Sequence, residues 1–444
     1  MSDGTMLREI AAEILKEVLE EGEYSHVALS RALGKYQYLE KQDRSFLKRV
    51  VDGTVEYRLQ MDYIIESYSR TKVNKMKPFI RTLLRMSAYQ IYYMDRVPDS
   101  AVCNEAVRLA KKRGFQGLSG FVNGVLRAIV RGKETLIFPD DSIRCSMPAW
   151  ILERWEKEQG KEAALRMAEA SLAERPMTVG LYTAYAEKDE ILTLLKEQGV
   201  CAKEVLSGSG VYELSGVDYP ESLLAFQKGF LRVQDLSSSL AGDAAGLQPG
   251  DFVLDVCGAP GGKGLHAAEL LCGTGMVEIR DVSSKKIAMI EENIVRSGCK
   301  NARAVLWDAR IKDASMVERA DAVLADLPCS GLGIIGRKPD IKYNASPEGI
   351  SSLAALQREI LSVVWQYVKP GGTLVYSTCT VSREENEKNR DWFLERFPFE
   401  PVDLTGRLGD GFSEKSLQDG YIQLLPGIHP CDGFFIAVMR RKKK

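Results

Sequence analysis

Apolar residues in the first part of the chain recur at the spacing of amphipathic helices. In the first such run, the residues of the apolar face are Leu7, Ile10, Ile14, Val18 and Leu19. Gly22 then supplies a stop. The same spacing continues in four later segments, at residues 43–66, 77–94, 100–112 and 117–130. We therefore predict an all-helical domain over residues 1–133.

The pattern of residues 140–233 predicts a linker helix followed by a small α+β module. Residues 134–147 interrupt the helical periodicity, which returns from residue 148 to about residue 173. After it, short strand patterns at residues 177–181, 211–214 and 229–233 surround one helical pattern at residues 188–198.

From residue 234 to residue 444, strand and helix patterns alternate. The expected strands are residues 252–256, 276–281, 304–307, 322–326 and 373–377. The expected helices are residues 262–271, 284–297, 351–368 and 384–396. This alternation predicts an α/β domain with a doubly wound, largely parallel sheet, and residues 422–425 and 433–439 predict a terminal antiparallel hairpin.

Composition and cysteine usage favour a globular protein of the cytoplasm. The 444 residues predict two or three domains, and no apolar run is long enough to cross a membrane. The first residues, Met-Ser-Asp-Gly, lack the pattern of a signal peptide. The nine cysteines are scattered without a Cys-x-x-Cys pair, which argues against a disulfide framework or a metal site. We expect a cytoplasmic protein with no membrane partner and no metal.

Basic residues are segregated within the predicted helical domain, although the net charge of the chain is only −1. Residues 70–85 contain six Lys or Arg, residues 107–133 contain seven, and neither run contains an acid. The first helix is acidic instead, with Glu17, Glu20, Glu21 and Glu23. A single charge run is often just a solvated face, but two such runs in one domain favour RNA binding.

A glycine-rich loop follows the first strand of the predicted parallel sheet. The loop, Gly258-Ala-Pro-Gly-Gly-Lys-Gly264, is neither a Walker A loop nor a Gly-x-Gly-x-x-Gly loop, because its glycines are wrongly spaced. Asp281 ends the next strand, where it could accept ribose hydroxyls, and Asp308 follows the third, where it could meet an adenine amino group. This arrangement suits S-adenosylmethionine. The alternative is a tight turn with two capping acids.

Two cysteines follow the last two strands of the predicted parallel sheet. Cys329 lies in Asp326-Leu-Pro-Cys, and Cys379 follows the strand at residues 373–377. Ligands of such sheets bind at the carboxyl ends of the strands, so both thiols and Asp326 can reach a substrate there. A lone cysteine is usually a small buried hydrophobe, but two at neighbouring strand ends beside a cofactor loop favour chemistry.

Two thiols suit the methylation of a cytosine at carbon 5. This carbon becomes nucleophilic after a thiolate has added to carbon 6, and the thiol must later be expelled, a step that a second cysteine could assist. Asp326 could accept a hydrogen bond from the exocyclic amine of cytosine. Histidine is absent from the strand-end motifs, so the base that removes the carbon 5 proton is a water, a thiol or Asp326.

Three motifs carry a resemblance to a known family. Asp-x-Cys-x-Ala-Pro-Gly-Gly-Lys, Asp-x-Pro-Cys-Ser and Ser-Thr-Cys-x-x-x-x-Glu-Glu-Asn together resemble the RNA 5-methylcytosine methyltransferases of the Nop2/Sun family. The helical N-terminal domain resembles the antitermination factor NusB, a pairing that is similar to the bacterial Sun/Fmu group. Two positions depart from the family pattern: Gly264 stands where Thr or Ser is usual, and Leu327 where Ala is commoner.

The resemblance implies a Rossmann-like methyltransferase domain over residues 234–444 and a role for each motif residue. It implies that Cys379 is the nucleophile and Cys329 the release cysteine. It implies that the residues around the S-adenosylmethionine cofactor are Cys257, Gly258, Ala259, Pro260, Gly261, Gly262, Lys263, Asp281, Asp308 and Asp326.

The expected activity is methylation of carbon 5 of a specific cytosine in 16S ribosomal RNA through a covalent cysteine–cytosine adduct, carried out by a monomer. Two alternatives stay open. The same reaction could act on transfer RNA or on another ribosomal position, because the motifs do not distinguish these. The chain could also be a non-catalytic RNA-binding or ribosome assembly factor.

Overall fold

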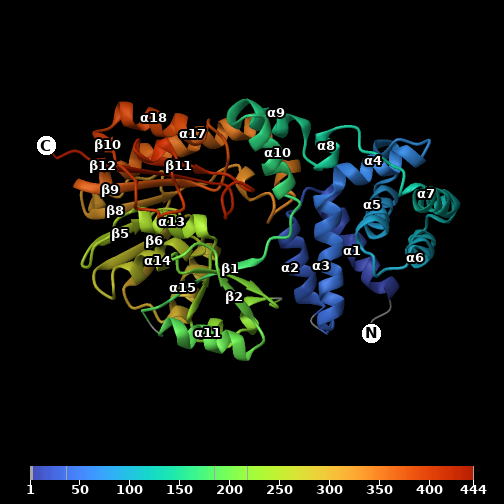
Figure 1. The fold of residues 1–444 in the computed structure, drawn as a ribbon, viewed down its shortest axis with the longest axis horizontal. Coiled ribbons are helices and arrows are strands. Elements are labelled where there is room, and N and C mark those ends of the chain that lie inside the picture. The colour runs from blue at the N-terminus through green and yellow to red at the C-terminus, as the bar shows by residue number, and fades with distance from the viewer. Residues whose placement is uncertain (1–3, 37, 185, 218, 444) are drawn as a thin grey trace. The chain divides into compact units, whose positions relative to one another are not determined.

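The computed structural model describes residues 4–36, 38–184, 186–217 and 219–443 (Figure 1). The chain forms two compact units. One comprises Met1–Ala173 with Ile335–Asn344, and the other comprises Glu174–Ile334 with Ala345–Lys444. The finer division at residues 133, 140 and 234 stays a prediction. None of the described helices combines the length and apolar character needed to span a bilayer.

The first unit is helical, as the sequence predicts. Its helices are α1 (Gly4–Glu20), α2 (Ser25–Lys35), α3 (Lys41–Glu56), α4 (Arg58–Tyr68), α5 (Pro78–Tyr93), α6 (Asp99–Lys112), α7 (Ser119–Gly132), α8 (Asp141–Arg144), α9 (Ala149–Gln159) and α10 (Lys161–Ala170). The apolar stripe predicted for α1 packs in one core together with residues such as Leu47, Leu83 and Leu126, and all of it except the partly buried Leu19 is buried.

Two predicted helices of this unit are interrupted in the structure. The segment at residues 43–66 is two helices that meet at Tyr57, and the segment at residues 148–173 breaks at Gly160. Gly160 has φ of 88°, a left-handed conformation that is open to glycine and ends α9. Tyr57 is neither glycine nor proline, so its break carries no local signal in the sequence.

A short segment, Ile335–Asn344, belongs to the helical unit although it lies between two strands of the other unit along the chain. It contains α16 (Ile341–Asn344). The Lys342 Nζ atom is buried and donates to the Glu56 carbonyl oxygen at 2.8 Å, and the Asp340 carboxylate accepts from Ser25 Oγ at 2.6 Å at the start of α2. These bonds tie the segment to α2 and α3.

The second unit begins with the small α+β module. Its strands are β1 (Met177–Leu181), β2 (Cys201–Glu204), β3 (Val211–Ser215) and β4 (Leu231–Val233), in the antiparallel order β2-β3-β1-β4. Its helices are α11 (Lys188–Glu197) and α12 (Leu224–Gln227). Val179, Ile191 and Leu231 lie in one shared core, which holds the helices against the sheet.

The larger sheet has the order β10-β12-β9-β8-β5-β6-β7, with β11 paired to β12. Its strands are β5 (Phe252–Asp255), β6 (Met276–Asp281), β7 (Ala302–Leu306), β8 (Ala320–Asp326), β9 (Val368–Thr378), β10 (Phe399–Pro401), β11 (Tyr421–Leu424) and β12 (Phe434–Arg441). Strands β5 to β9 pair in parallel, and β10 to β12 are antiparallel. This mixed sheet confirms the predicted Rossmann-like fold and the terminal hairpin.

Helices cover both faces of this sheet. They are α13 (Leu236–Ala244), α14 (Gly262–Leu270), α15 (Ser284–Ser297), α17 (Pro347–Val364) and α18 (Glu387–Arg396). Neighbouring residues of β8 alternate between two cores, because Leu324 packs with α13 to α15 whereas Val323 packs with α17 and α18. β5 pairs with β6 on one side and β8 on the other, which makes its carboxyl end the switch point of the sheet.

Candidate active site

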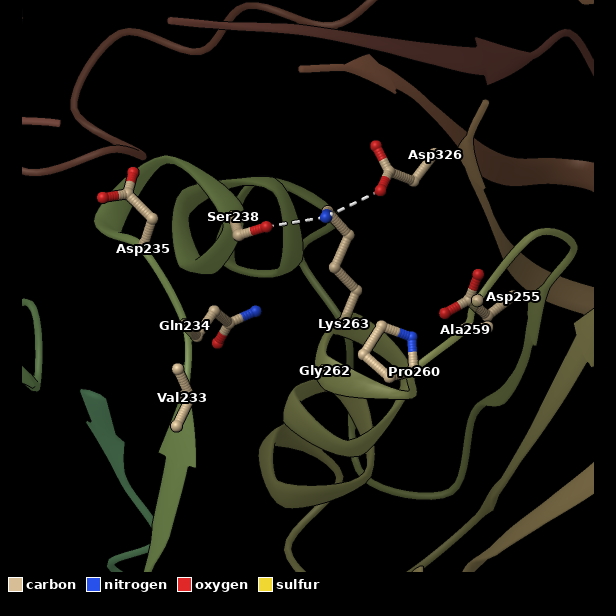
Figure 2. A pocket seen from close by; sticks show the side chains of 11 residues that line it. Val233, Gln234, Asp235, Ser238, Asp255, Ala259, Pro260, Gly262, Lys263 and Asp326 are labelled. Carbon is tan, nitrogen blue, oxygen red and sulfur yellow. Dashed lines mark hydrogen bonds and ion pairs between the residues drawn. The ribbon is translucent and has the colours of Figure 1, made fainter. Parts of the chain in front are cut away.

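A cavity of about 200 Å³ lies at the carboxyl ends of β5 and β8. It is lined by Val233, Gln234, Asp235, Ser238, Asp255, Gly258, Ala259, Pro260, Gly262, Lys263 and Asp326. Figure 2 shows these residues converging from the end of β4, from α13, from the glycine loop and from the end of β8. The cavity thus occupies the switch point, where ligands of this fold class bind.

The glycine loop presents bare backbone to this cavity. A side chain at Gly258 would collide with the fold, because its Cβ would lie 2.4 Å from Ile279 Cγ2 and 2.6 Å from an Asp255 carboxylate oxygen. At Gly262, by contrast, the nearest atom to such a Cβ is Gln234 Nε2, at 3.9 Å. The space beside Gly262 is therefore open, and a ligand can approach the backbone there closely.

Lys263 links two elements of the cavity wall (Figure 2). Its Nζ donates to Ser238 Oγ at 2.6 Å and lies 2.7 Å from Asp326 Oδ2, while Asp326 Oδ1 accepts from Ser377 Oγ at 2.9 Å. Burial alone would lower the pKa of Lys263, but the Asp326 carboxylate outweighs it and the pKa is raised. The cation therefore persists at neutral pH and fixes the direction of Asp326.

Asp255 is a buried carboxyl group beneath the glycine loop. It ends β5 and is fully buried. Burial, and secondly the charge of Asp326, raise the pKa of Asp255 to about 7. Its protonation state therefore changes in the physiological range, which sequence inspection did not anticipate.

The two predicted catalytic cysteines lie in contact. Asp326 of β8 pairs with Ser377 of β9, and the chain continues from these two residues to Cys329 and Cys379. Their Sγ atoms are 3.2 Å apart. The contact with Cys379, together with burial, raises the pKa of Cys329 well above its ordinary value, so this thiol keeps its proton at neutral pH.

Glu385 binds the residues that follow both cysteines, and it was not among the residues predicted for the site. Its carboxylate accepts from the Ser330 backbone N–H at 2.8 Å and from Ser330 Oγ at 2.6 Å. Ser330 Oγ in turn lies 2.7 Å from Thr380 Oγ1. Glu385 is fully buried, so these bonds hold the two cysteine loops together in a low-dielectric interior. The sequence did contain a signal for Glu385, because it is the second glutamate of the Glu-Glu-Asn motif that follows Cys379.

Several predicted cofactor residues lie outside the cavity lining. These are Cys257, Gly261, Asp281 and Asp308. Asp281 is buried at the end of β6, where it accepts from the Ser283 backbone N–H at 3.3 Å and from Lys286 Nζ at 3.3 Å. Asp308 pairs with Arg310, which holds its pKa below the usual range. The roles of Asp281 toward ribose and of Asp308 toward adenine stay predictions.

Val233, Gln234, Asp235 and Ser238 line the cavity but were not predicted as site residues. They lie where β4 of the small module leads into α13. Asp235 caps α13 by accepting from the Ser237 backbone N–H, and it also accepts from the Asp432 backbone N–H at 3.1 Å. The run Val-Gln-Asp-Leu-Ser-Ser is a helix start by its sequence, and nothing local in it indicates a ligand site.

Several basic residues of the helical unit are neutralised by local acids. Arg81 pairs with Glu20, Arg85 with Asp62, Lys112 with Glu9, and Arg113 with Glu9 and Glu13. The acid-free runs of the sequence are therefore not acid-free surfaces. Within the part of the chain that the structure describes, Lys111, Arg127 and Arg131 are exposed and form no ion pair. Likewise, no described group of three His, Cys, Asp or Glu residues is placed to hold a metal.

Family models match both parts of the chain. Residues 244–440 match the model of the 16S rRNA methyltransferase RsmB/F family, and residues 5–131 match that of the NusB family. The first of these segments contains both cysteines and the glycine loop. The second contains all but the first residue of α1, the whole of α2 to α6 and most of α7.

The chain is also similar to full-length proteins. It is 37% identical to the probable ribosomal RNA small subunit methyltransferase B of Bacillus subtilis, with 99% of each chain covered. It is 32% identical to ribosomal RNA small subunit methyltransferase B of Cronobacter sakazakii, with 100% of each covered. Among solved structures, that of PH0851 matches with a TM-score of 0.82 and 25% identity over all of both chains. A methyltransferase homologue from Pyrococcus horikoshii matches 69% of this chain and 100% of its own, with a TM-score of 0.58 and 28% identity.

Proposed function

The chain belongs to the 16S rRNA methyltransferase RsmB/F family, and we propose that it methylates carbon 5 of a cytosine in 16S ribosomal RNA. Family membership makes it an RNA methyltransferase with S-adenosylmethionine as its cofactor. The target atom and the covalent route are the proposal. The observation that carries it is the 3.2 Å contact between Cys329 and Cys379 at the ends of β8 and β9.

The residues of the cavity fit the cofactor. The open space beside Gly262 admits a polar ligand, and Gln234 Nε2 is a buried donor that has no hydrogen-bond partner among the residues that the structure describes. We assign Cys257–Lys263 and Asp326 to the cofactor surroundings, with Asp281 and Asp308 toward its ribose and adenine. When bound, S-adenosylmethionine supplies an electrophilic methyl group.

Cys379 is the proposed nucleophile. Its thiolate adds to carbon 6 of cytosine, which forms an S–C6 bond and moves the electron pair of the C5–C6 double bond onto carbon 5. Carbon 5 uses this pair to form the new bond to the methyl group, whose bond to the sulfonium sulfur of the cofactor breaks and leaves its electron pair on that sulfur. Loss of the carbon 5 proton then restores the double bond as the S–C6 bond breaks and releases the Cys379 sulfur.

Cys329 assists this release. Because its thiol stays protonated beside Cys379, it can donate a hydrogen bond to the departing sulfur and stabilise the negative charge that develops there. Asp326, held by Lys263 and Ser377, keeps a lone pair on each oxygen, and one oxygen can accept from the exocyclic amine of cytosine. The group that removes the carbon 5 proton is a water, a thiol or Asp326.

A labelled-methyl transfer assay tests this function. The full-length protein is incubated with labelled S-adenosylmethionine and unmodified 16S rRNA transcript, with a transfer RNA pool in a parallel reaction. We expect label in the 16S transcript, at 5-methylcytosine after nuclease digestion, and none with Cys379→Ala. Label at another base atom would contradict the proposed chemistry. Label in transfer RNA alone would contradict the proposed substrate, and an inert wild-type protein would favour an assembly factor.

A further inference from the structure

Gln234 is a buried side chain of the cavity wall whose orientation is fixed from behind. It is 6% exposed, and its Oε1 accepts from Arg232 Nε at 2.6 Å. Arg232 is itself held by an ion pair with Glu269, and its guanidinium lies 5.2 Å from the centroid of the Tyr182 ring. Gln234 is thus anchored through its side-chain carbonyl oxygen.

This anchoring decides which way the amide group faces. An arginine Nε can donate but cannot accept, so the atom in contact with it must be the carbonyl oxygen of Gln234. The Nε2 amino group therefore lies on the other side, facing Lys263 and Gly262 in Figure 2. Among the described residues, nothing accepts a hydrogen bond from this Nε2 atom. A buried donor left unpaired destabilises the folded protein, so a ligand acceptor at this position would recover that loss.

The start of α14 shares this space. Its N-cap is Gly261, with φ of 108°, and no side chain caps it among the residues that the structure describes. The first backbone N–H groups of this nine-residue helix therefore point toward the cavity with the positive end of the helix dipole. Gln234 Nε2 is 3.9 Å from the Cβ position of Gly262, so the side-chain donor and the helix start face the same volume.

The opposite wall carries two carboxyl groups. Asp326, which is paired with Lys263, lines the cavity on that side, and Asp255 lies beneath the loop. Hydrogen-bond donors at one end and carboxylates at the other match the two charges of an α-amino acid, which presents a carboxylate and an ammonium group. The methionine part of S-adenosylmethionine has both charges.

We propose that Gln234 Nε2, together with the backbone N–H groups at the start of α14, binds the α-carboxylate of S-adenosylmethionine. This assignment rests on the proposed placement of the cofactor in the cavity. It makes Gln234 a residue that selects the cofactor by its amino-acid end, and Arg232 the residue that positions it.

Calorimetry on the full-length protein tests the assignment with two ligands, S-adenosylmethionine and its decarboxylated form, which differ by the carboxylate alone. Gln234→Leu should weaken S-adenosylmethionine binding by roughly tenfold and leave the decarboxylated ligand within about twofold of wild type. Gln234→Glu keeps an acceptor for Arg232 but places a carboxylate against the carboxylate. The Gln234→Glu variant should therefore bind S-adenosylmethionine more weakly than Gln234→Leu does, and should bind the decarboxylated ligand as tightly as wild type.

Gln248→Leu, the same substitution at an exposed glutamine, is the control and should bind both ligands as wild type does. Equal losses for both ligands in the Gln234 variants would overturn the assignment, because they indicate a packing role. Unchanged cofactor binding with slower RNA methylation would overturn it in favour of a contact with the base. Wild-type protein that binds neither ligand would overturn the cofactor placement itself, a result distinct from the other two.

Discussion

The Sγ atoms of Cys329 and Cys379 lie 3.2 Å apart although fifty residues separate them in the chain. Two features create this contact. The parallel register of β8 and β9 aligns Asp326 with Ser377 just before the two thiols, and Glu385 binds Ser330 in the loop beyond. The pairing is thus a consequence of the sheet edge and of one buried carboxylate.

Cys379→Ala should abolish methyl transfer and leave cofactor affinity within about twofold of wild type, because the thiol is assigned to the base and does not line the cofactor cavity. Labelled-methyl transfer and calorimetry measure the two effects separately. Cys272→Ala, at an exposed cysteine outside the site, is the matched control. Methyl transfer by Cys379→Ala at the wild-type rate would remove this residue from the nucleophile role.

Glu385→Gln should slow methyl transfer by roughly 10–100-fold without changing cofactor affinity. The Ser330 N–H and hydroxyl groups donate to different oxygens of the carboxylate, and the substitution replaces one of these oxygens with an N–H₂ group. The cysteine loops therefore lose one of their two acceptors and the negative charge that strengthens the other. Glu384→Gln is the control, because Glu384 accepts from Ser351 instead. A lower kcat with unchanged KM and melting temperature is the expected signature. An equal effect of both variants on stability, with no change in kcat, would contradict the positioning role.

Much of the fold follows from periodicity because the relevant interactions are local. The bounds predicted for β1 and β6 match the structure, and the last two strands form the predicted hairpin. Helix α2, which was not predicted, begins after Tyr24 without a side-chain cap from its own neighbourhood. Its first residue, Ser25, instead bonds Asp340, which is 315 residues away in the chain. Such a partner leaves no local pattern.

The contrast between local patterns and distant contacts also explains which residues of the candidate site could be predicted. Strand-end motifs revealed the glycine loop, Asp326 and the two cysteines, because each follows an apolar strand of the parallel sheet. Gln234 and Ser238 follow β4, which belongs to the other sheet, so their place in the cavity depends on how the small module packs. The basic runs were overestimated for a related reason: Glu9, Glu13 and Glu20 on α1 reach them through tertiary packing.

Charge reversal at Lys111, Arg127 and Arg131 should weaken RNA binding and flatten its salt dependence. These residues have no intramolecular counter-ion in the described structure, so they are available to phosphates. When such a phosphate contact is lost, RNA binding releases fewer counter-ions and depends less on salt. Reversal at Lys112 and Arg113, which already pair with α1, is the comparison and should change the slope less. Affinities at several salt concentrations give both slopes. If the triple variant, the double variant and the wild type all show the same dependence of affinity on salt, these residues form only a solvated face.

Asp255→Asn should stabilise the cofactor-free protein, increasingly so as the pH rises. The folded-state pKa of about 7 exceeds the unfolded value of about 3.9, so the folded state binds the extra proton between these values. Stability from this group is present at pH 4 and lost as the pH approaches and passes 7. The gap between variant and wild type should therefore grow from pH 5 to pH 8, by up to about 3 kcal/mol.

Denaturant titrations at unit pH steps measure that gap. Asp308→Asn is the control, since the pKa of Asp308 is lowered by Arg310 and this group stays ionised throughout the range. A gap for Asp255→Asn that stays constant with pH would show that Asp255 does not titrate there.

Cys329→Ala should behave differently from Cys379→Ala, and this contrast tests the two-thiol mechanism most directly. Removal of Cys329 leaves addition and methyl transfer possible, but the departing sulfur of Cys379 loses its hydrogen-bond donor at 3.2 Å. The variant should therefore accumulate a covalent protein–RNA species. This species should appear as a slow band on a denaturing gel and require S-adenosylmethionine to form.

The double variant Cys329→Ala/Cys379→Ala separates the two possible assignments. If Cys379 forms the bond to carbon 6, the double variant shows no band, and Cys379→Ala alone shows none either. If the roles are exchanged, the band appears in Cys379→Ala and is absent from Cys329→Ala. We expect the first outcome, which is the assignment that the resemblance to the Nop2/Sun family implies. A band in Cys379→Ala alone would exchange the two roles and leave the reaction class unchanged.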